Sequence, residues 1–346
     1  MPDQPTTYRD AGVDIEAMNV AVQRMRESVR STYSSGVLTD LGSFGGVFRP
    51  DLAGYEDPVL VSSIDGVGTK VKIAAMAGRY DTIGADLLCH CVNDILVQGA
   101  SPLFFMDYFA TARLDPEVVV AVVAGLADAC RANGCALLGG ETAEMPGVYA
   151  PGEFDVAGCI VGIADRSQLV DGSRIEPGDA VIGLASSGLH TNGYSLARHV
   201  LLEVGGLALD ETPAALGGIT LADALLAPHR SYASAVLPLV AERRIKGMAH
   251  ITGGGFYDNI PRTLPADCSV TVDRRTWTVP GIFALIQELG NVPDPEMYRA
   301  FNMGIGMVLI VERTGAAEVI AALQVAGENP SLIGEVYRGV REVDIL

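Results

Sequence analysis

Short apolar stretches alternate with helical patterns along most of the chain, and turns rich in glycine separate them. Residues 59–64 and 102–111 are typical of strands, whereas 81–99 predicts a helix because its apolar residues recur every four positions. A capped and punctuated helix is expected over 114–134, with Asp115 as the cap and Gly134 as the stop. This alternation favours an α/β or α+β class with mixed sheets.

The same pattern continues after a polar segment, Arg166 to Asp179, that carries glycine and proline. Further helices are expected over 192–203, 221–243 with a break at Pro228, 280–290 and 314–327, and further strands over 135–140, 156–164, 180–185, 246–252, 269–273, 304–312 and 331–339. At roughly 150 residues per domain, 346 residues suggest two domains. We predict domains over 1–168 and 175–346.

The charge balance narrows the classes of partner. Lys and Arg total 24 against 42 Asp and Glu, a net charge of −18, which disfavours nucleic acid as a partner. The longest apolar run, 118–127, is too short for a bilayer, so no membrane role is expected. The six cysteines form no Cys-x-x-Cys pair and indicate reduced core thiols of a cytosolic protein, and the N-terminus does not resemble a signal peptide.

The segment SSIDGVGTK, residues 62–70, joins a predicted strand to a helix and suggests an anion site. Its glycines allow close backbone approach, and a helix N-terminus offers free amides to a phosphate. Lys70 adds a positive charge, whereas Asp65 would repel a bare phosphate, which argues for magnesium between them. The spacing is not that of a P-loop, and an ordinary turn is the alternative.

Two further segments carry acidic residues. Asp86, His90 and Asp94 share one face of the predicted helix, and a solvated helix face is enough to explain these polar residues. Asp94, however, lies near the C-terminal end of the helix, where the helix dipole disfavours a carboxylate, and this position favours a ligand role for it. In LLGGETAEMPGVY, Glu141 and Glu144 follow a glycine pair at a strand end. A metal or acid/base role and a capping role are equally compatible with that pattern.

Two loops of the second half carry polar or glycine-rich sequences. SSGLHTNGYS gathers hydrogen-bonding groups around His190, which is a candidate functional residue, whereas His199 and His229 are predicted to be structural residues on helices. ITGGGFYDNIPR places Gly253 to Gly255 between a strand and a helix, which favours a second phosphate site. Glycine-rich loops in both halves, with carboxylates at only one, indicate an ATP-using enzyme acting on a phosphorylated small molecule.

Six blocks together resemble the phosphoribosylformylglycinamidine cyclo-ligase family: YRDAGVDI, SSIDGVGTK, CVNDILVQGASPLFFMDYFAT, GGETAEMPGVY, SSGLHTNGYSL and ITGGGFYDNIPR. The likeness runs from Tyr8 to about Arg338. It implies an ATP- and magnesium-dependent cyclisation of formylglycinamidine ribonucleotide in cytoplasmic purine biosynthesis. It also implies a homodimer whose N-terminal domains pair their sheets into a barrel.

With this resemblance, each candidate residue receives an expected role. The expected magnesium ligands are Asp65, Asp94 and Glu141; the ATP site comprises Asp65, Gly66, Val67, Gly68, Thr69, Lys70 and Asn93; the ribose phosphate site comprises Asn192, Gly253, Gly254 and Gly255; and the catalytic candidates are His190, Asp94 and Lys70. The N-terminal domain should therefore bind ATP and dimerise, and the C-terminal domain should contribute the ribose phosphate site.

Departures from the family pattern are few. ATARL replaces a usual Gly-Lys pair before leucine, Thr191 replaces a serine, and His90 stands where methionine is common, so His90 is left out of the predicted site. One rival is a related kinase-like enzyme; a selenophosphate synthetase usually has a reactive N-terminal Cys, and no cysteine precedes Cys89. A non-catalytic nucleotide sensor is a second rival, but nucleotide binding alone does not require three placed acids.

Overall fold

Two compact units make up the computed structural model, which describes residues 7–346. Unit 1 consists of the chain up to Ala53 together with Ser62–Cys91 and Pro102–Val161, and unit 2 consists of Gly54–Val61, Val92–Ser101 and Gly162–Leu346. Each unit contains its own sheet, four-stranded in the first and six-stranded in the second. The expected mixed α/β class with two sheets is confirmed.

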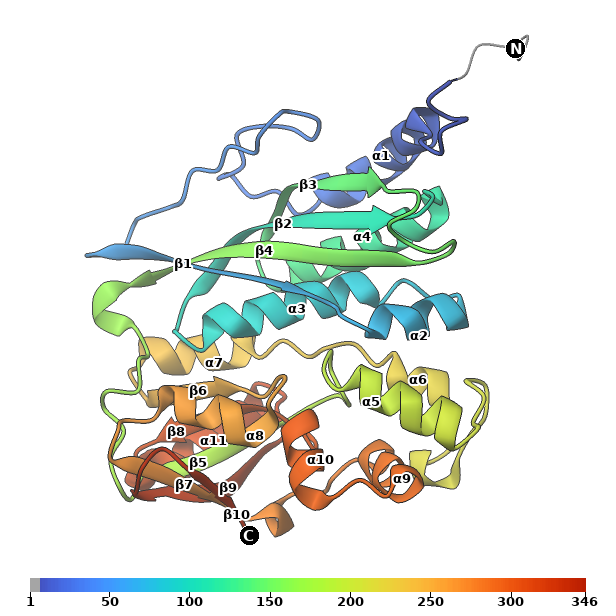
Figure 1. The fold of residues 1–346 in the computed structure, drawn as a ribbon. Coiled ribbons are helices and arrows are strands. Elements are labelled where there is room, and N and C mark those ends of the chain that lie inside the picture. The colour runs from blue at the N-terminus through green and yellow to red at the C-terminus, as the bar shows by residue number, and fades with distance from the viewer. Residues whose placement is uncertain (1–6) are drawn as a thin grey trace. The chain divides into compact units, whose positions relative to one another are not determined.

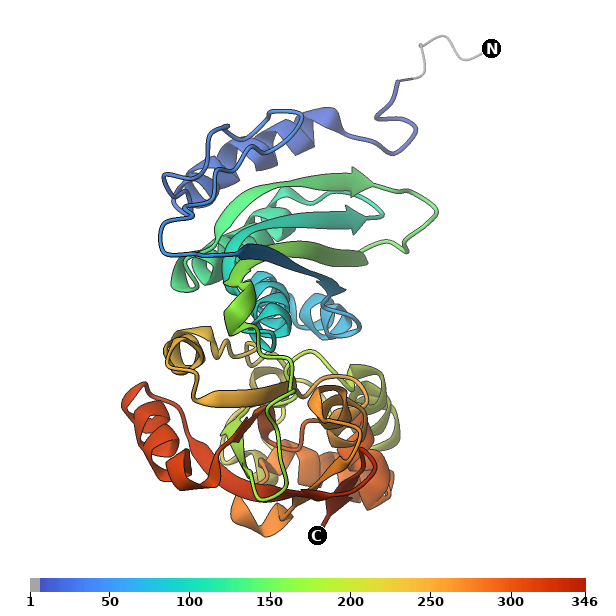
Figure 2. The same cartoon turned by 90° about the vertical axis from the view of Figure 1, so that its left-hand side faces the viewer.

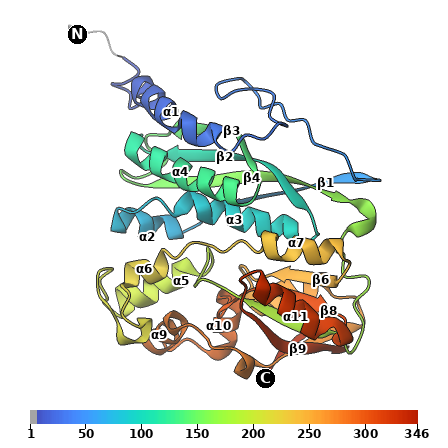
Figure 3. The same cartoon turned by 180° about the vertical axis from the view of Figure 1, so that it is seen from behind.

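Unit 1 is organised around a sheet with strand order β1-β4-β2-β3, in which β2 and β3 run parallel (Figure 1). The elements that lie wholly or mainly in unit 1 are α1 (Ile15–Arg30), β1 (Pro58–Gly66), α2 (Lys70–Ala77), α3 (Ile83–Leu96), β2 (Ser101–Thr111), α4 (Pro116–Ala132), β3 (Ala136–Glu144) and β4 (Phe154–Asp165), and the C-terminal end of α3, from Val92, belongs to unit 2. Helices α3 and α4 lie against one face of the sheet, as the view from behind shows (Figure 3). No helix of unit 1 within residues 7–346 covers the opposite face (Figure 1).

Helix α1 was not expected from the sequence, because only Ala21, Met25 and Val29 of its residues are buried. Its start is nevertheless encoded locally, since the Asp14 side chain accepts hydrogen bonds from two backbone N–H groups of the first turn. The helix packs on α4 and β3 and runs along the β3 edge of the sheet (Figure 2). The predicted cap of α4 is confirmed, because Asp115 accepts from the Glu117 N–H.

Unit 2 is built on a sheet with strand order β10-β7-β9-β5-β8-β6, antiparallel except for the β10–β7 pair. Its strands are β5 (Ala180–Ala185), β6 (Ile245–His250), β7 (Cys268–Val272), β8 (Ile305–Val311), β9 (Pro330–Arg338) and β10 (Val343–Ile345). Its α-helices are α5 (Tyr194–Arg198), α6 (Leu221–Leu225), α7 (Ala233–Ala241), α8 (Gly255–Asn259), α9 (Gly281–Gly290), α10 (Asp294–Ala300) and α11 (Ala316–Val325). Strand β8 is buried along its whole length, which explains its uninterrupted apolar sequence.

Short helical turns complete the two units. They are η1 (Arg166–Gln168), the π-helical η2 (His199–Val204), η3 (Ala214–Leu216), η4 (Ile260–Thr263), η5 (Arg274–Thr276) and η6 (Arg313–Gly315). The predicted strands of the second half are all present, whereas helix α10 and strand β10 were missed. The expected break at Pro228 is also present, since α6 ends at Leu225 and α7 begins at Ala233.

The cysteines are free thiols, and all except Cys159 are buried, as expected for core residues. Among residues 7–346, no helix is both long and apolar enough to cross a membrane.

Candidate active site

The loop from β1 to α2 in unit 1 exposes part of the predicted phosphate site. Gly68 and Thr69 are exposed, and Gly68 has φ +67°, a left-handed conformation that glycine adopts without strain. The amides of Gly66 and Val67 are already used within the protein, because they donate to Asp65 Oδ1 (2.7 Å) and to the Val156 carbonyl (3.2 Å). The exposed end of this loop is therefore the part best placed to meet an anion.

Lys70 does not face solvent in this structure. Its Nζ lies 2.8 Å from Asp86 Oδ1, and both side chains are fully buried. Burial lowers the pKa of Lys70, and the Asp86 carboxylate opposes that shift. The contact makes Asp86 a partner of Lys70 rather than part of a solvated helix face, and a direct bond from Lys70 to ATP stays a prediction.

His90, which the sequence analysis left out of the site, contacts a predicted site residue. Its Nε2 lies 2.9 Å from Asp65 Oδ2, and the histidine side chain is buried while the aspartate side chain is half exposed. The carboxylate of Asp65 is thus held from two sides, by His90 and by the Gly66 amide. The four-residue spacing of polar groups on α3 was the available signal, but it does not reveal which loop they meet.

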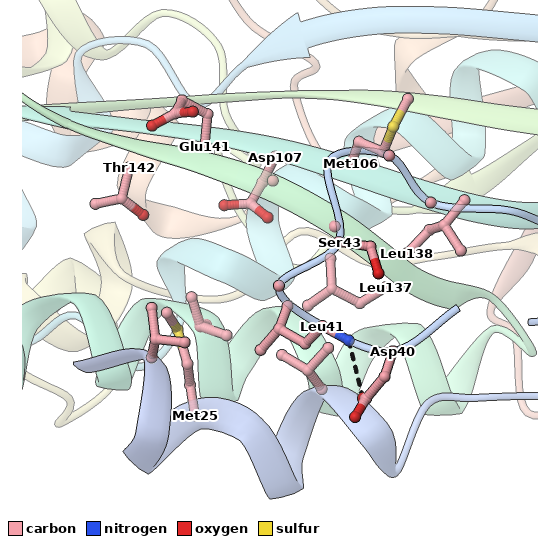
Figure 4. Close-up of a pocket in the computed structure, with 18 of the residues that line it drawn as sticks. Met25, Asp40, Leu41, Ser43, Met106, Asp107, Leu137, Leu138, Glu141 and Thr142 are labelled. Atoms are coloured by element: carbon pink, nitrogen blue, oxygen red, sulfur yellow. Dashed lines mark hydrogen bonds between the residues drawn. The ribbon is translucent and has the colours of Figure 1, made fainter. Parts of the chain in front are cut away.

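Glu141 lines a pocket of about 520 Å³ in unit 1 (Figure 4). The pocket lies among α1, the loop of residues 40–46, and strands β2 and β3, and Asp107 and Thr142 also line it. Desolvation raises the pKa of Asp107 to about 7. The sequence analysis missed Asp107, because a single acid within an apolar strand gives no signal of its own.

Glu144, the second acid of that segment, has a structural role. Its Oε1 accepts a hydrogen bond from the Leu114 N–H at 2.6 Å, and its Oε2 accepts one from the Asp14 N–H. The carboxylate therefore ties the start of α1 to the turn before α4. Glu144 is therefore a structural residue, in line with the capping alternative and not with a metal or acid/base role. Glu141 is exposed, and its role as a metal ligand stays a prediction.

In unit 2, the loop after β5 holds His190 in a buried and unusual conformation. His190 has φ +60°, which is rare for a residue other than glycine, and its Nε2 accepts from the Ser187 N–H at 3.2 Å. A Cβ atom at Gly306 would lie 2.5 Å from the ring of His190, so the absence of a side chain there makes room for the histidine.

The predicted ribose phosphate residues Asn192 and Gly253 are brought together. The Gly253 N–H donates to Asn192 Oδ1 at 3.0 Å. Gly254 and Gly255 have φ +91° and +57°, and a Cβ atom at Gly255 would lie 1.9 Å from the Tyr298 carbonyl oxygen. Backbone geometry therefore requires glycine at positions 254 and 255, whereas Gly253, the exposed member, is the one that touches Asn192.

His229 and His250 join this part of unit 2. The expectation that His229 lies on a helix was wrong, because it lies between α6 and α7. Its Nδ1 is 3.2 Å from Thr191 Oγ1, and its Nε2 is 3.0 Å from His250 Nε2. His250 Nδ1 lies 2.9 Å from Asp94 Oδ1, so a residue that the sequence analysis missed contacts a predicted site residue. Its position at the end of β6, before the glycine run, was the available signal.

Asn93 also belongs to this polar group. Its amide nitrogen donates to the Arg230 carbonyl at 2.8 Å and lies 3.2 Å from His229 Nε2, while its oxygen accepts from the Tyr232 N–H at 3.1 Å. In this structure Asn93 therefore orders the segment before α7, and its predicted contact with ATP remains a prediction.

The carboxylates predicted for magnesium suit that ion in kind, since magnesium prefers oxygen ligands. Asp65 and Glu141 are both exposed. Among residues 7–346, however, neither belongs to a cluster of three or more side chains already close enough to share a metal ion. The magnesium assignment therefore stays a prediction.

Family models match most of the chain. The AIR synthase related protein N-terminal domain matches residues 46–164, and the corresponding C-terminal domain matches residues 176–345. Among solved structures, the chain is similar to thiamine-monophosphate kinase from Stenotrophomonas maltophilia, with a TM-score of 0.69, 17% identity, and 93% and 95% of the two chains covered. The hydrogenase maturation protein HypE in complex with ATP has the same TM-score, with 21% identity and coverage of 97% and 93%. At such low identity, these likenesses show the fold.

Curated relatives are much more similar in sequence. Phosphoribosylformylglycinamidine cyclo-ligase of Trichlorobacter lovleyi is 52% identical over 330 residues, which cover 95% of this chain and 94% of that protein. The protein of the same name from Geotalea daltonii is 53% identical over 332 residues, covering 96% and 95%. Identity of this degree over nearly the full length, with both domain models in order, shows that the chain belongs to the phosphoribosylformylglycinamidine cyclo-ligase family of enzymes.

Proposed function

We propose that the chain catalyses the ATP-dependent cyclisation of formylglycinamidine ribonucleotide to aminoimidazole ribonucleotide in purine biosynthesis, in the cytoplasm. The observation that carries this proposal is the identity of about half of all residues with cyclo-ligases over almost the entire chain. The ATP in the HypE structure, a relative in fold alone, is in keeping with nucleotide use by this architecture.

The chemistry explains the need for ATP. The formyl oxygen of the substrate is an amide oxygen and a poor leaving group. Its attack on the γ-phosphorus releases ADP and gives an iminophosphate; the amidine nitrogen of the same molecule then attacks the formyl carbon, and phosphate leaves with the former oxygen. Closure within one bound molecule gains from proximity, so the chain must mainly hold the two reacting groups together and exclude water.

The proposed roles follow the two units. In unit 1, the exposed residues Gly68 and Thr69 receive phosphate oxygens at their backbone, with Asp65 held beside them by His90. In unit 2, Gly253 and Asn192 bind the ribose phosphate, because their mutual hydrogen bond orders the exposed backbone of that loop. His190 is the candidate that orients the formyl oxygen.

Magnesium is expected to be held by carboxylates from the predicted set Asp65, Asp94 and Glu141. When bound, it would neutralise phosphate charge and polarise the phosphoryl group. Asp94 has its Oδ1 directed to His250, and this contact fixes the orientation of the carboxylate. The residues thus fit a hard cation in donor type, and the protein contributes their orientation.

A homodimer is part of the proposal. Ile64, Met106 and Tyr108 are large apolar residues of β1 and β2 that remain exposed in unit 1. An exposed apolar group on a sheet is typical of a protein interface. Pairing of two such sheets, as the family resemblance implies, would cover these side chains.

The test uses purified protein with formylglycinamidine ribonucleotide, ATP and magnesium. We expect ADP, phosphate and aminoimidazole ribonucleotide to form in equal amounts. Accumulation of a stable phosphorylated substrate would instead identify a kinase, and ATP hydrolysis without ring formation would also refute the proposal. Asp94→Asn should abolish turnover while leaving the circular dichroism spectrum unchanged, and near-normal turnover would refute the role of Asp94.

A further inference from the structure

The glycine loop of unit 2, residues 252–255, turns its carbonyl oxygens toward a buried side chain. The Asn259 amide nitrogen lies 3.2 Å from the Gly253 oxygen and 2.8 Å from the Gly255 oxygen, and Asn259 is only 3% exposed. Carbonyl lone pairs would repel an anion, but here they are engaged inside the protein. The outer side of the loop is therefore suited to the proposed ribose phosphate.

The loop nevertheless offers no positive charge of its own. The Gly253 N–H already donates to Asn192 Oδ1, and the Gly255 N–H donates to a carbonyl of the same loop at 2.9 Å. An acid also lies close by, because a Cβ atom at Gly254 would meet Asp258 Oδ2 at 2.7 Å. This carboxylate repels a phosphate dianion, and the whole chain has a net charge of −18. A phosphate held at this loop therefore needs a cation nearby.

Arg299 supplies a cation next to the loop. It lies in the last turn of α10, and a Cβ atom at Gly255 would lie 3.0 Å from the Arg299 Cα atom. Its guanidinium carbon lies 5.9 Å from the ring centroid of Tyr257, two residues further along α8. Arg299 is exposed, and no carboxylate of residues 7–346 pairs with it. Its charge is thus available at the rim of the loop.

We propose that Arg299 binds the ribose phosphate of formylglycinamidine ribonucleotide. This role rests on the proposed function, and it adds a charged residue to the neutral Asn192 and Gly253. A guanidinium offers two parallel N–H groups that match two phosphate oxygens. Because the Arg299 guanidinium lies over the Tyr257 ring, the N–H groups in its plane stay free for the phosphate.

A purely structural role for Arg299 makes a different prediction. If its contact with Tyr257 only holds α10 against α8, loss of the side chain lowers the melting temperature and weakens every substrate alike. If Arg299 binds phosphate, its loss weakens only the ligands that carry a phosphate. The nucleoside of the substrate, which lacks the phosphate, therefore separates the two roles.

The experiment compares formylglycinamidine ribonucleotide with the corresponding ribonucleoside, using the full-length protein at saturating ATP and magnesium. The initial slope of rate against substrate concentration gives kcat/KM for each substrate, even where binding is too weak for saturation. In Arg299→Gln, kcat/KM for the ribonucleotide should fall about 10–100-fold, because a hydrogen bond between charged groups is lost. The value for the ribonucleoside and the KM for ATP should not change. Dissociation constants measured by calorimetry without ATP, with the ribonucleoside as the weak competitor, should change in the same way.

Further variants test the chemistry of the contact. Arg299→Lys keeps the charge but not the two parallel N–H groups, so it should lose less activity than Arg299→Gln. Arg313→Gln is the matched control, because Arg313 is also exposed in unit 2 and pairs with Glu335 on the surface. Its kcat/KM should equal that of the unaltered protein for both substrates. Arg299→Met, which keeps an apolar contact with Tyr257, serves if Arg299→Gln melts early in circular dichroism.

The outcomes distinguish the role of Arg299 from the proposed function. Ring formation by the unaltered protein, with an unchanged kcat/KM for the ribonucleotide in Arg299→Gln, would overturn the role of Arg299 alone. An equal fall for the ribonucleotide and the ribonucleoside would also overturn it, since that result indicates a structural role. Absence of ring formation by the unaltered protein would refute the proposed function, and the role of Arg299 would fall with it.

Discussion

Removal of the Lys70 charge should destabilise the protein strongly, because Lys70 and Asp86 form a fully buried ion pair with 2.8 Å between Nζ and Oδ1. Lys70→Met keeps the length of the side chain but leaves the Asp86 carboxylate buried opposite an apolar group. Breaking one partner of a buried pair costs about 3–5 kcal/mol. For a domain of this size, we expect a fall in melting temperature of roughly 10 °C.

The matched control is Lys72→Met on the same helix. Lys72 pairs with Glu153, but both side chains are more than one third exposed, and such surface pairs contribute about 1 kcal/mol or less. Urea denaturation followed by circular dichroism measures the free energy of unfolding of both variants. Equal stability of the two variants would refute the assignment of Lys70 to a buried ion pair.

The double variant Lys70→Met with Asp86→Leu separates structure from function. Replacement of both charges by apolar groups should restore most of the lost stability, since no charge then remains buried without its partner. ATP affinity of this variant, measured by calorimetry, then tests the prediction that Lys70 binds phosphate. Unchanged affinity would restrict Lys70 to positioning α2, whereas a stable variant that no longer binds ATP would support direct contact.

Three further predictions concern other parts of the molecule. The pKa of Asp107 is raised to about 7, so the folded protein keeps a proton that the unfolded chain releases, and the free energy of unfolding should fall as the pH rises from about 4 to 7. Asp107→Asn should therefore raise the melting temperature at pH 8 but not at pH 4. Equal gains at both pH values would contradict this prediction. The double variant Ile64→Asp with Tyr108→Asp should shift the protein from dimer to monomer in light scattering, and an unchanged mass would reject the proposed interface. Gly253→Ala, whose Cβ atom would lie 3.5 Å from Asn192 Oδ1, should fold normally and raise KM for the ribonucleotide more than for ATP. Gly254→Val should also lower the stability of the protein, because Gly254 has φ +91°. Equal changes of the two KM values in Gly253→Ala would refute the assignment of ATP to one glycine loop and the ribonucleotide to the other.

The sequence by itself determined the elements and the family. Alternating apolar patterns identified every strand of the two sheets except β10, and most helices, because side-chain burial repeats with the period of the local backbone. The glycine positions were equally local, since left-handed φ values at Gly68, Gly254 and Gly255 require that residue type. Helix α1 escaped this reasoning because only three of its residues are buried.

Only the tertiary structure decided which polar groups meet. Asp94 and His250 are separated by 156 positions, and no local pattern connects them. His229 looked like a helical residue, yet chain packing places it between two helices and against His250. Lys70 looked like a phosphate ligand, but its charge is buried in an ion pair with Asp86, 16 positions further along the chain on α3. Periodicity encodes which face of an element is buried, whereas the partner of a buried polar group depends on how distant elements pack.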